Sequence, residues 1–246
     1  MHPELASLRA RVKELDYAGA GMYNATATIP GMGFFPAAWG GADPTSAIQG
    51  RPIMVLGQDQ DNMNGLAQSV RKGHETYSPS WRNLLVLLEN AGIAPEECFF
   101  TNFIMGVRWV SDRNTGPSPA LAHPTFMRAC AALFLEQLHI QQPRVIITLG
   151  MIPFQLLSLV STDLRYRAVG IKEFEAVDAR GLHINANVVF DDAHRTTTTV
   201  VPICHPCQPQ NGRRRPFRHT TQYTSEAGVL KYVLDTSVSG VVTADV

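Results

Sequence analysis

The chain alternates between short, continuously apolar runs and longer segments in which apolar residues recur every three or four positions. Continuous runs are typical of strands that are buried on both faces, and the longer spacing is typical of helices with one buried side. We therefore expect strands at 52–57, 98–102, 144–150 and 199–206, and helices at 80–92, 124–142 and 225–235. A short helix should follow the third strand, and weaker strand patterns lie near 173–178 and 186–190.

Residues that start and stop helices support these boundaries. Ser80 is the predicted N-cap of the first long helix, and Gly92 is its predicted stop. Pro124 suits the first turn of the next helix, because proline has no backbone N–H to leave unpaired there. A further helix near the N-terminus is indicated by apolar residues at helical spacing, namely Leu5, Leu8, Val12 and Leu15.

Strands that alternate with helices predict a mostly parallel sheet covered on both faces. We expect a three-layer α/β/α architecture with a central, mostly parallel four-stranded sheet, formed by a single domain over residues 1–246. Residues 1–50 would supply the N-terminal helix and an irregular wrapping segment, whose aromatic side chains are costly to leave in water. Residues 236–246 are expected to form a frayed tail.

The overall charge is balanced, with 21 Lys plus Arg against 21 Asp plus Glu. This balance argues against a constitutive nucleic-acid coat protein, but it allows a local basic edge. No segment has the roughly 20 apolar residues that span a bilayer, and the charged N-terminus lacks an apolar signal core, so we expect a cytoplasmic location. The cysteines are too few for a disulfide scaffold and suit reduced thiols: Cys98, Cys130, Cys204 and Cys207.

Polar side chains follow three of the predicted strands: Asp59 after the first, Asn102 at the end of the second, and His205 at the end of the last. In parallel α/β sheets the working residues gather outside the carboxyl ends of the strands. A carboxylate can orient a water, an amide can read the edge of a nucleobase, and an imidazole can donate to an oxygen that acquires negative charge. Cleavage of an N-glycosidic bond needs all three functions.

Four motifs in this order resemble the uracil-DNA glycosylase superfamily. They are "GQDQD" after the first strand, "GLAQSV" a few residues later, "FFTN" at the end of the second strand, and "HPCQPQNGRRR" after the last. The likeness covers about 52–217 and is closest to the branch that carries GQD and GLAxSV motifs.

The resemblance implies a role for each residue at the strand ends. Asp59 would position the attacking water and steady the sugar cation, and Gln58 would contact the base through its backbone amide. Asn102 would read the Watson–Crick edge of a flipped base, and His205 would donate a hydrogen bond to the developing oxyanion of the base.

The loop that follows His205 would enter the DNA as the nucleotide is extruded. Gln210 and Asn211 stand where an apolar wedge is often found in the family. An arginine cluster follows and suits phosphate contacts: Arg213, Arg214, Arg215 and Arg218.

Three positions depart from the pattern of the resembled branch. Gln60 and Asp61 replace the proline and tyrosine that form the pocket floor there, and Gln68 replaces the aromatic residue that stacks on the base. A glutamine does not supply the base stacking worth about 1–3 kcal/mol that an aromatic ring provides. The candidate rings that remain are Tyr77, Phe34 and Phe35.

Taken together, these residues favour a monomeric, monofunctional DNA glycosylase that removes a uracil-like, modified or damaged base by base excision from duplex or single-stranded DNA, without metal or cofactor. An alternative is a catalytically silent module that binds a nucleobase on the same fold. A third is a thiol or metal protein built on the CxxC of Cys204 and Cys207.

The residues at the strand ends also have plainer readings. Asp59 could cap a turn, Asn102 could form an Asx-turn, and His205 could be a satisfied buried histidine. All three side chains should line one cleft if the catalytic reading is right.

Overall fold

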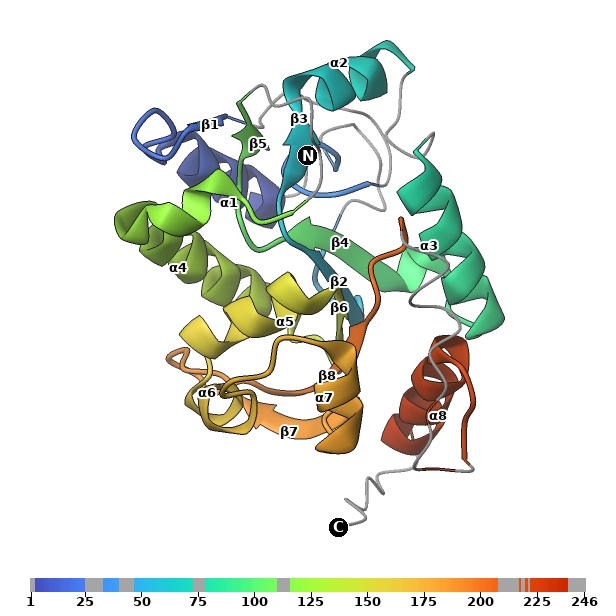
Figure 1. The fold of residues 1–246 in the computed structure, drawn as a ribbon. Helices are drawn as coiled ribbons and strands as arrows, with labels where there is room; N and C mark the ends of the chain where they lie inside the picture. The colour runs from blue at the N-terminus through green and yellow to red at the C-terminus, as the bar shows by residue number, and fades with distance from the viewer. Residues whose placement is uncertain are drawn as a thin grey trace.

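A five-stranded sheet forms the centre of the molecule (Figure 1). The computed structural model describes residues 3–24, 33–39, 47–72, 78–109, 116–207, 217, 220 and 222–238. In the order β4-β2-β6-β8-β7, the strands are β4 (Cys98–Asn102), β2 (Ile53–Gly57), β6 (Val145–Leu149), β8 (Thr197–Ile203) and β7 (Asn185–Val189). The first four run parallel and β7 pairs antiparallel with β8. The predicted fold class is confirmed, and β7, one of the two weaker strand patterns, adds a fifth strand to the four predicted.

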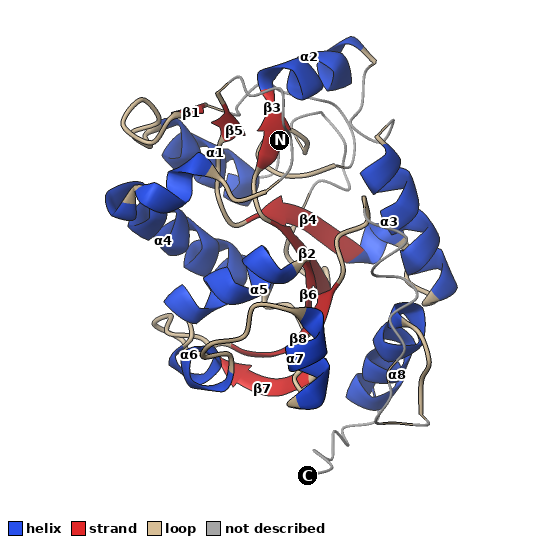
Figure 2. Ribbon diagram, viewed as in Figure 1, coloured by secondary structure: helices blue, strands red, loops and turns tan. Residues whose placement is uncertain are grey.

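Helices cover both faces of this sheet, with α3 and α8 on one side and α1 and α4 on the other (Figure 2). The helices are α1 (Pro3–Lys13), α2 (Met63–Arg71), α3 (Pro79–Asn90), α4 (Pro124–Gln141), α5 (Met151–Leu156), α6 (Thr162–Arg167), α7 (Phe174–Ala179) and α8 (Glu226–Val238). A second, small sheet has the order β1-β5-β3 and contains β1 (Met22–Tyr23), β5 (Val107–Arg108) and β3 (Gln60–Asn62). Within the described ranges, none of the helices combines the length and apolarity that a bilayer span requires.

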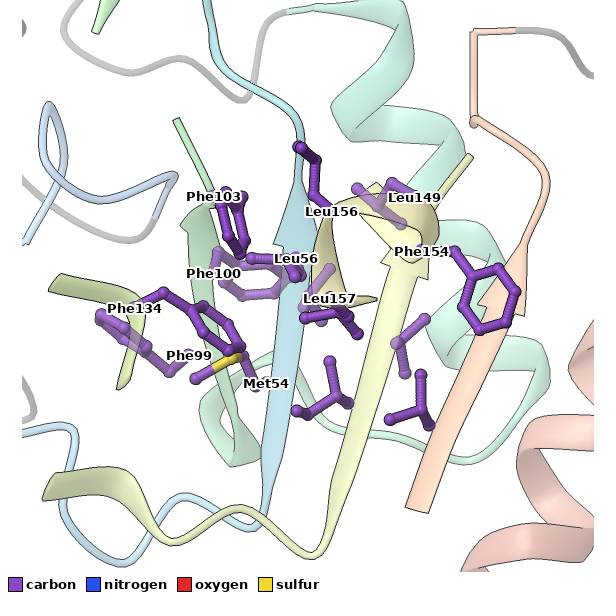
Figure 3. Packing of buried hydrophobic residues seen from close by; sticks show 14 of the residues in the cluster. Met54, Leu56, Phe99, Phe100, Phe103, Phe134, Leu149, Phe154, Leu156 and Leu157 are labelled. Carbon is purple, nitrogen blue, oxygen red and sulfur yellow. The ribbon is translucent and has the colours of Figure 1, made fainter. Parts of the chain in front are cut away.

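Aromatic side chains fill much of the space between the sheet and α4 (Figure 3). Phe103, just after β4, stacks on Phe134 of α4 with ring centroids 5.2 Å apart. Every residue of β2, β4 and β6 is buried, which explains why these strands read as continuous apolar runs rather than as alternating patterns.

One detail of the predicted helices and one predicted strand are wrong. The N-cap of α3 is Ser78 rather than Ser80, since Ser78 Oγ accepts the backbone N–H of Trp81 at 3.2 Å and Pro79 takes the first helical position. Residues 173–178 do not form a strand, because Phe174 and Val177 lie three residues apart on the inner side of α7.

The end of the chain also differs from the prediction. Helix α8 continues through Thr236, where the frayed tail was expected to begin. The hydroxyl of Thr236 donates to the carbonyl of Tyr232 at 2.8 Å, one turn earlier in the same helix. Residues 239–246 lie outside the described residues.

Part of the irregular segment after the first helix packs against the edge strand β4. The backbone N–H of Phe35 donates to the carbonyl of Phe100 at 2.9 Å, and Phe35 forms a parallel bridge with Thr101. Gln60, which is 5% exposed, donates its side-chain amide to the carbonyls of Phe34 and Phe35 at 3.1 and 3.3 Å. The segment 33–39 therefore extends the sheet at the carboxyl end of β4, and Gln60 holds it there.

Replacement of Gln60 by leucine should weaken this attachment. The variant loses two hydrogen bonds from a buried amide, which we expect to lower the free energy of unfolding by about 1–3 kcal/mol in urea titration. Gln68→Leu, on the exposed side of α2, is the matched control and should change it by less than about 0.5 kcal/mol. Equal stability of the two variants would show that Gln60 does not hold the segment.

Candidate active site

The strand register brings the predicted polar residues to one edge of the sheet. Gly57 at the end of β2 pairs with Asn102 at the end of β4, and Leu149 of β6 pairs with Ile203 of β8. The chain continues from these ends, so Asp59, Asn102 and His205 all lie at the carboxyl edge, with β6 between β2 and β8. Backbone bonds hold the segments after β2 and β4 side by side, for example from the N–H of Ile104 to the carbonyl of Gln58 at 2.8 Å.

The Asn102 amide lies directly over the backbone of Gly57. A β-carbon at position 57 would stand 2.2 Å from Asn102 Oδ1 and 3.3 Å from Phe34 Cε1, so glycine is required by the close approach of both side chains. Asn102 is 3% exposed, yet its side-chain amide makes no hydrogen bond within the described part of the chain. A nearly buried amide with unused donor and acceptor groups is costly, and this one is therefore available to a ligand.

Of the two candidate rings that the structure describes, Phe34 is the one that lies beside Gly57 together with this amide. It packs edge-on against Trp81 and Phe100, with ring centroids 5.7 and 5.9 Å away. Phe35 is fully buried in the core beside Phe99 and faces away from solvent. Tyr77 lies outside the described residues. Phe34 is thus the ring that the structure places next to Asn102.

His205 is held at the end of β8 by contacts from both sides. Gly150, whose φ of +96° favours glycine, lies against it, and a β-carbon there would be in van der Waals contact with His205 Cβ at 3.5 Å. The side chain of Asn83 on α3 donates to the carbonyl of Pro206 at 3.0 Å. On the other side of His205, Glu226 of α8 accepts the backbone N–H of Cys204 at 2.7 Å.

The hydrogen bonds of His205 fix its tautomer. Its Nδ1 accepts the backbone N–H of Cys207 at 3.2 Å and lies 2.9 Å from Cys207 Sγ. Burial lowers the pKa of His205 below 6.5, so the neutral ring predominates at pH 7. With Nδ1 as acceptor, the proton resides on Nε2, which makes the ring a neutral hydrogen-bond donor.

Asp59 forms a buried ion pair with Arg108 of β5. Arg108 Nε donates to Asp59 Oδ2 at 2.7 Å and Nη2 donates to Oδ1 at 3.0 Å, while the two side chains are 9% and 6% exposed. The guanidinium also reaches the carbonyl of Gly116 at 3.0 Å. Asp59 is therefore more than a turn cap, and Arg108 is a member of the site that the sequence analysis did not identify.

A sequence signal for Arg108 existed. It is the single charged residue in the apolar stretch 103–110, which follows the strand that carries Asn102. A lone charge in such a run is rarely buried without a partner, and Asp59 offered one at the neighbouring strand end.

Of the remaining predicted residues, the structure describes the side chains of Gln60 and Gln68. Gln60 binds the wrapping segment, as described above, and Gln68 lies on the exposed side of α2. Asp61 belongs to β3, but its side chain is outside the described part of the structure. The predicted DNA-contacting residues lie outside the described residues and stay predictions: Gln210, Asn211, Arg213, Arg214, Arg215 and Arg218.

The cysteines of the CxxC motif differ in their surroundings. Cys204 is buried beside Glu226, and burial and this carboxylate raise its pKa. Cys207 is exposed, and partial burial of its sulfur also raises its pKa. Both therefore stay thiols at neutral pH, which disfavours thiolate chemistry. The described side chains contain no group of three or more His, Cys, Asp or Glu that could hold a metal ion.

A methyl group at position 57 should displace the Asn102 amide. We expect Gly57→Ala to lower the free energy of unfolding by about 1–3 kcal/mol, because the added β-carbon overlaps Asn102 Oδ1. The double variant Gly57→Ala/Asn102→Ala removes the clash and should be less destabilised than the sum of its single variants. Additive losses in urea titration would contradict the close approach.

The burial of neutral His205 should also make stability depend on pH. Because the pKa of His205 is lower in the folded protein, the unfolded chain binds this proton more readily, and the free energy of unfolding falls as the pH drops through about 6.5. We expect His205→Gln to lose less stability than the wild type between pH 7 and pH 5, as measured by urea titration at each pH. Parallel pH curves for the two proteins would contradict the burial of a neutral ring.

Comparison with known proteins gives the family of the chain. No curated protein matches the sequence. A scan against protein families matches residues 46–226 to the family described as the uracil DNA glycosylase superfamily, and this range contains Asp59, Asn102, Arg108 and His205. The match covers more than half of the sequence and agrees with the α/β/α fold. The chain therefore belongs to the uracil DNA glycosylase superfamily.

Proposed function

We propose that the protein is a monofunctional DNA glycosylase that hydrolyses the N-glycosidic bond of a uracil-like base flipped out of DNA. The observation that carries this proposal is the Asn102 amide, which is 3% exposed and makes no hydrogen bond within the described residues. It lies beside the Phe34 ring at the carboxyl edge of the sheet, the edge from which Asp59 and His205 also extend. Family membership supports a glycosylase-type hydrolase that acts on DNA.

The Asn102 amide supports recognition of a nucleobase edge. Uracil presents an N–H donor at N3 next to a carbonyl acceptor at C4, and a side-chain amide offers the complementary acceptor and donor. The Phe34 ring beside it supports stacking on the face of the same base, worth about 1–3 kcal/mol. A base that leaves the duplex would regain here part of the stacking and pairing it gave up.

His205 and Asp59 support the bond-breaking step. As the bond between C1′ of the sugar and the base nitrogen breaks, its electron pair leaves with the base, and the Nε2–H of His205 donates to the base oxygen that gains this charge. Asp59 stabilises the positive charge on the sugar and orients a water whose oxygen bonds to C1′. One water proton passes to the carboxylate, the base takes a proton from solvent, and an abasic site is left in the DNA.

Gln60, Asp61 and Gln68 bear on which base the protein removes. These residues stand where the resembled branch has its pocket floor and stacking ring. Gln60 is engaged with the wrapping segment and Gln68 is exposed, whereas Phe34 lies beside Asn102. A pocket built on Phe34 supports a base range that includes 5-substituted uracils as well as uracil.

The test is base release from oligonucleotides that carry uracil, 5-substituted uracils, hypoxanthine, xanthine or mismatched thymine, in duplex and single-stranded form, followed by alkaline strand cleavage. We expect the wild type to cleave at least one of the uracil substrates. His205→Gln should reduce the single-turnover rate roughly 100- to 1,000-fold, because it removes the donor to the developing oxyanion. Asp59→Asn should reduce it roughly 100- to 10,000-fold.

Asp163→Asn and His139→Gln replace the same residue types on helices α6 and α4 and should keep the wild-type rate. No cleavage of any substrate by the wild type, together with salt-dependent DNA binding, would replace the enzyme proposal with a silent base-binding module.

A further inference from the structure

Arg108 contacts three parts of the site at once. Its guanidinium binds both oxygens of Asp59, the carbonyl of Gly116, and the Gln58 side chain when the amide is oriented so that Oε1 accepts from Nη2 at 3.3 Å. In that orientation the same Oε1 also accepts the backbone N–H of Ser118 at 2.5 Å. One buried side chain thus connects the end of β2 with the segment 116–118.

The small sheet explains how Arg108 reaches this position. Strand β5 pairs in parallel with β3, with Val107 opposite Gln60 and Arg108 opposite Asn62. Val107 is fully buried and anchors the strand, and the backbone N–H of Gln60 donates to the carbonyl of Gly106 at 3.1 Å. The arginine therefore extends from a fixed backbone, and its fork meets the carboxylate at a defined angle.

The pair has to stay closed while the carboxylate acts. An ionised carboxylate has about four acceptor positions, and the fork takes one on each oxygen. Opening the pair would leave two buried charges without compensation and would also break the bonds to Gly116 and Gln58.

We propose that Arg108 is a positioning residue, which fixes the orientation of the Asp59 carboxylate during catalysis and couples that orientation to the segment 116–118. This inference rests on the proposed function, since Asp59 is the group that it positions. It assigns Arg108 no contact with the base or the sugar. Replacement of Arg108 should therefore change the rate only by changing the position of Asp59.

The first test is a double-variant cycle in single-turnover base release. Arg108→Gln should lower the rate constant roughly 100-fold, because a carboxylate misplaced by about 1 Å loses a factor of this size, and KM should stay within about twofold. Arg108→Lys keeps the charge without the fork and should fall between the wild type and Arg108→Gln. In an Asp59→Asn background, Arg108→Gln should cause less than a twofold further loss.

Two outcomes of this cycle would overturn the proposal. A rate increase in Arg108→Gln would show that the arginine restrains Asp59 in an inactive state. An equal loss in the wild-type and Asp59→Asn backgrounds would show that Arg108 acts on the structure in general and not through Asp59. Arg128→Gln, an exposed arginine on α4, is the matched control and should keep the wild-type rate.

The second test does not depend on activity, so it separates failure of this inference from failure of the proposed function. Hydrogen exchange at the backbone N–H of Ser118 should be at least about tenfold faster in Arg108→Gln than in the wild type or Arg128→Gln, because the network that holds this N–H is lost. Unchanged exchange at Ser118 in a folded Arg108→Gln protein would overturn the coupling to segment 116–118. If the wild type cleaves no substrate, the proposed function and the positioning role in catalysis are both overturned. Faster exchange at Ser118 in Arg108→Gln would then support only the link between Arg108 and the segment 116–118.

Discussion

The close passage of the Asn102 side chain over the backbone of Gly57 is the constraint on which the rest of the site depends. It exists because β2 and β4 pair in parallel register with these two residues opposite each other at the carboxyl edge. The same pairing sends Gln58 and Asp59 out beside the segment that leads to Arg108, through the bond from Ile104 to Gln58. One residue of register shift would separate the amide from the glycine and exchange the faces on which all of these side chains lie.

The buried polar groups at this edge fall into two classes. Asp59, Gln60 and the Nδ1 of His205 are satisfied by protein groups. The Asn102 amide has no hydrogen-bond partner among the described residues. The first class is therefore fixed in place by the protein, whereas the Asn102 amide keeps donor and acceptor groups that a ligand could use. A preorganised site needs this arrangement, in which hydrogen bonds within the protein fix most polar groups and leave a group such as the Asn102 amide for the ligand.

Much of this arrangement could be predicted from the sequence, for reasons that particular residues make clear. The strands ending at Gly57 and Asn102 are continuous apolar runs, so their burial and their polar ends were visible in the pattern. Ser80 is not the N-cap of α3, because the helix begins two residues earlier with Ser78 as N-cap and Pro79 in the first helical position. The spacing of apolar residues is compatible with either serine. The pairing of Arg108 with Asp59 joins residues 49 positions apart and depends on the register of the small sheet. Likewise, no local signal distinguishes Phe34, which lies beside Asn102, from its buried neighbour Phe35.

We propose that the ends of β2, β4 and β8 together bind one extrahelical base. The most direct measurement is a crystal structure of the protein bound to duplex DNA with a single 2′-fluoro-2′-deoxyuridine, since the fluorine disfavours the sugar cation and preserves the bond. We expect a base stacked on Phe34, with its edge on the Asn102 amide and an oxygen within about 3.2 Å of His205 Nε2. A uridine that stays paired in the duplex, or a flipped base bound away from Asn102, would contradict it.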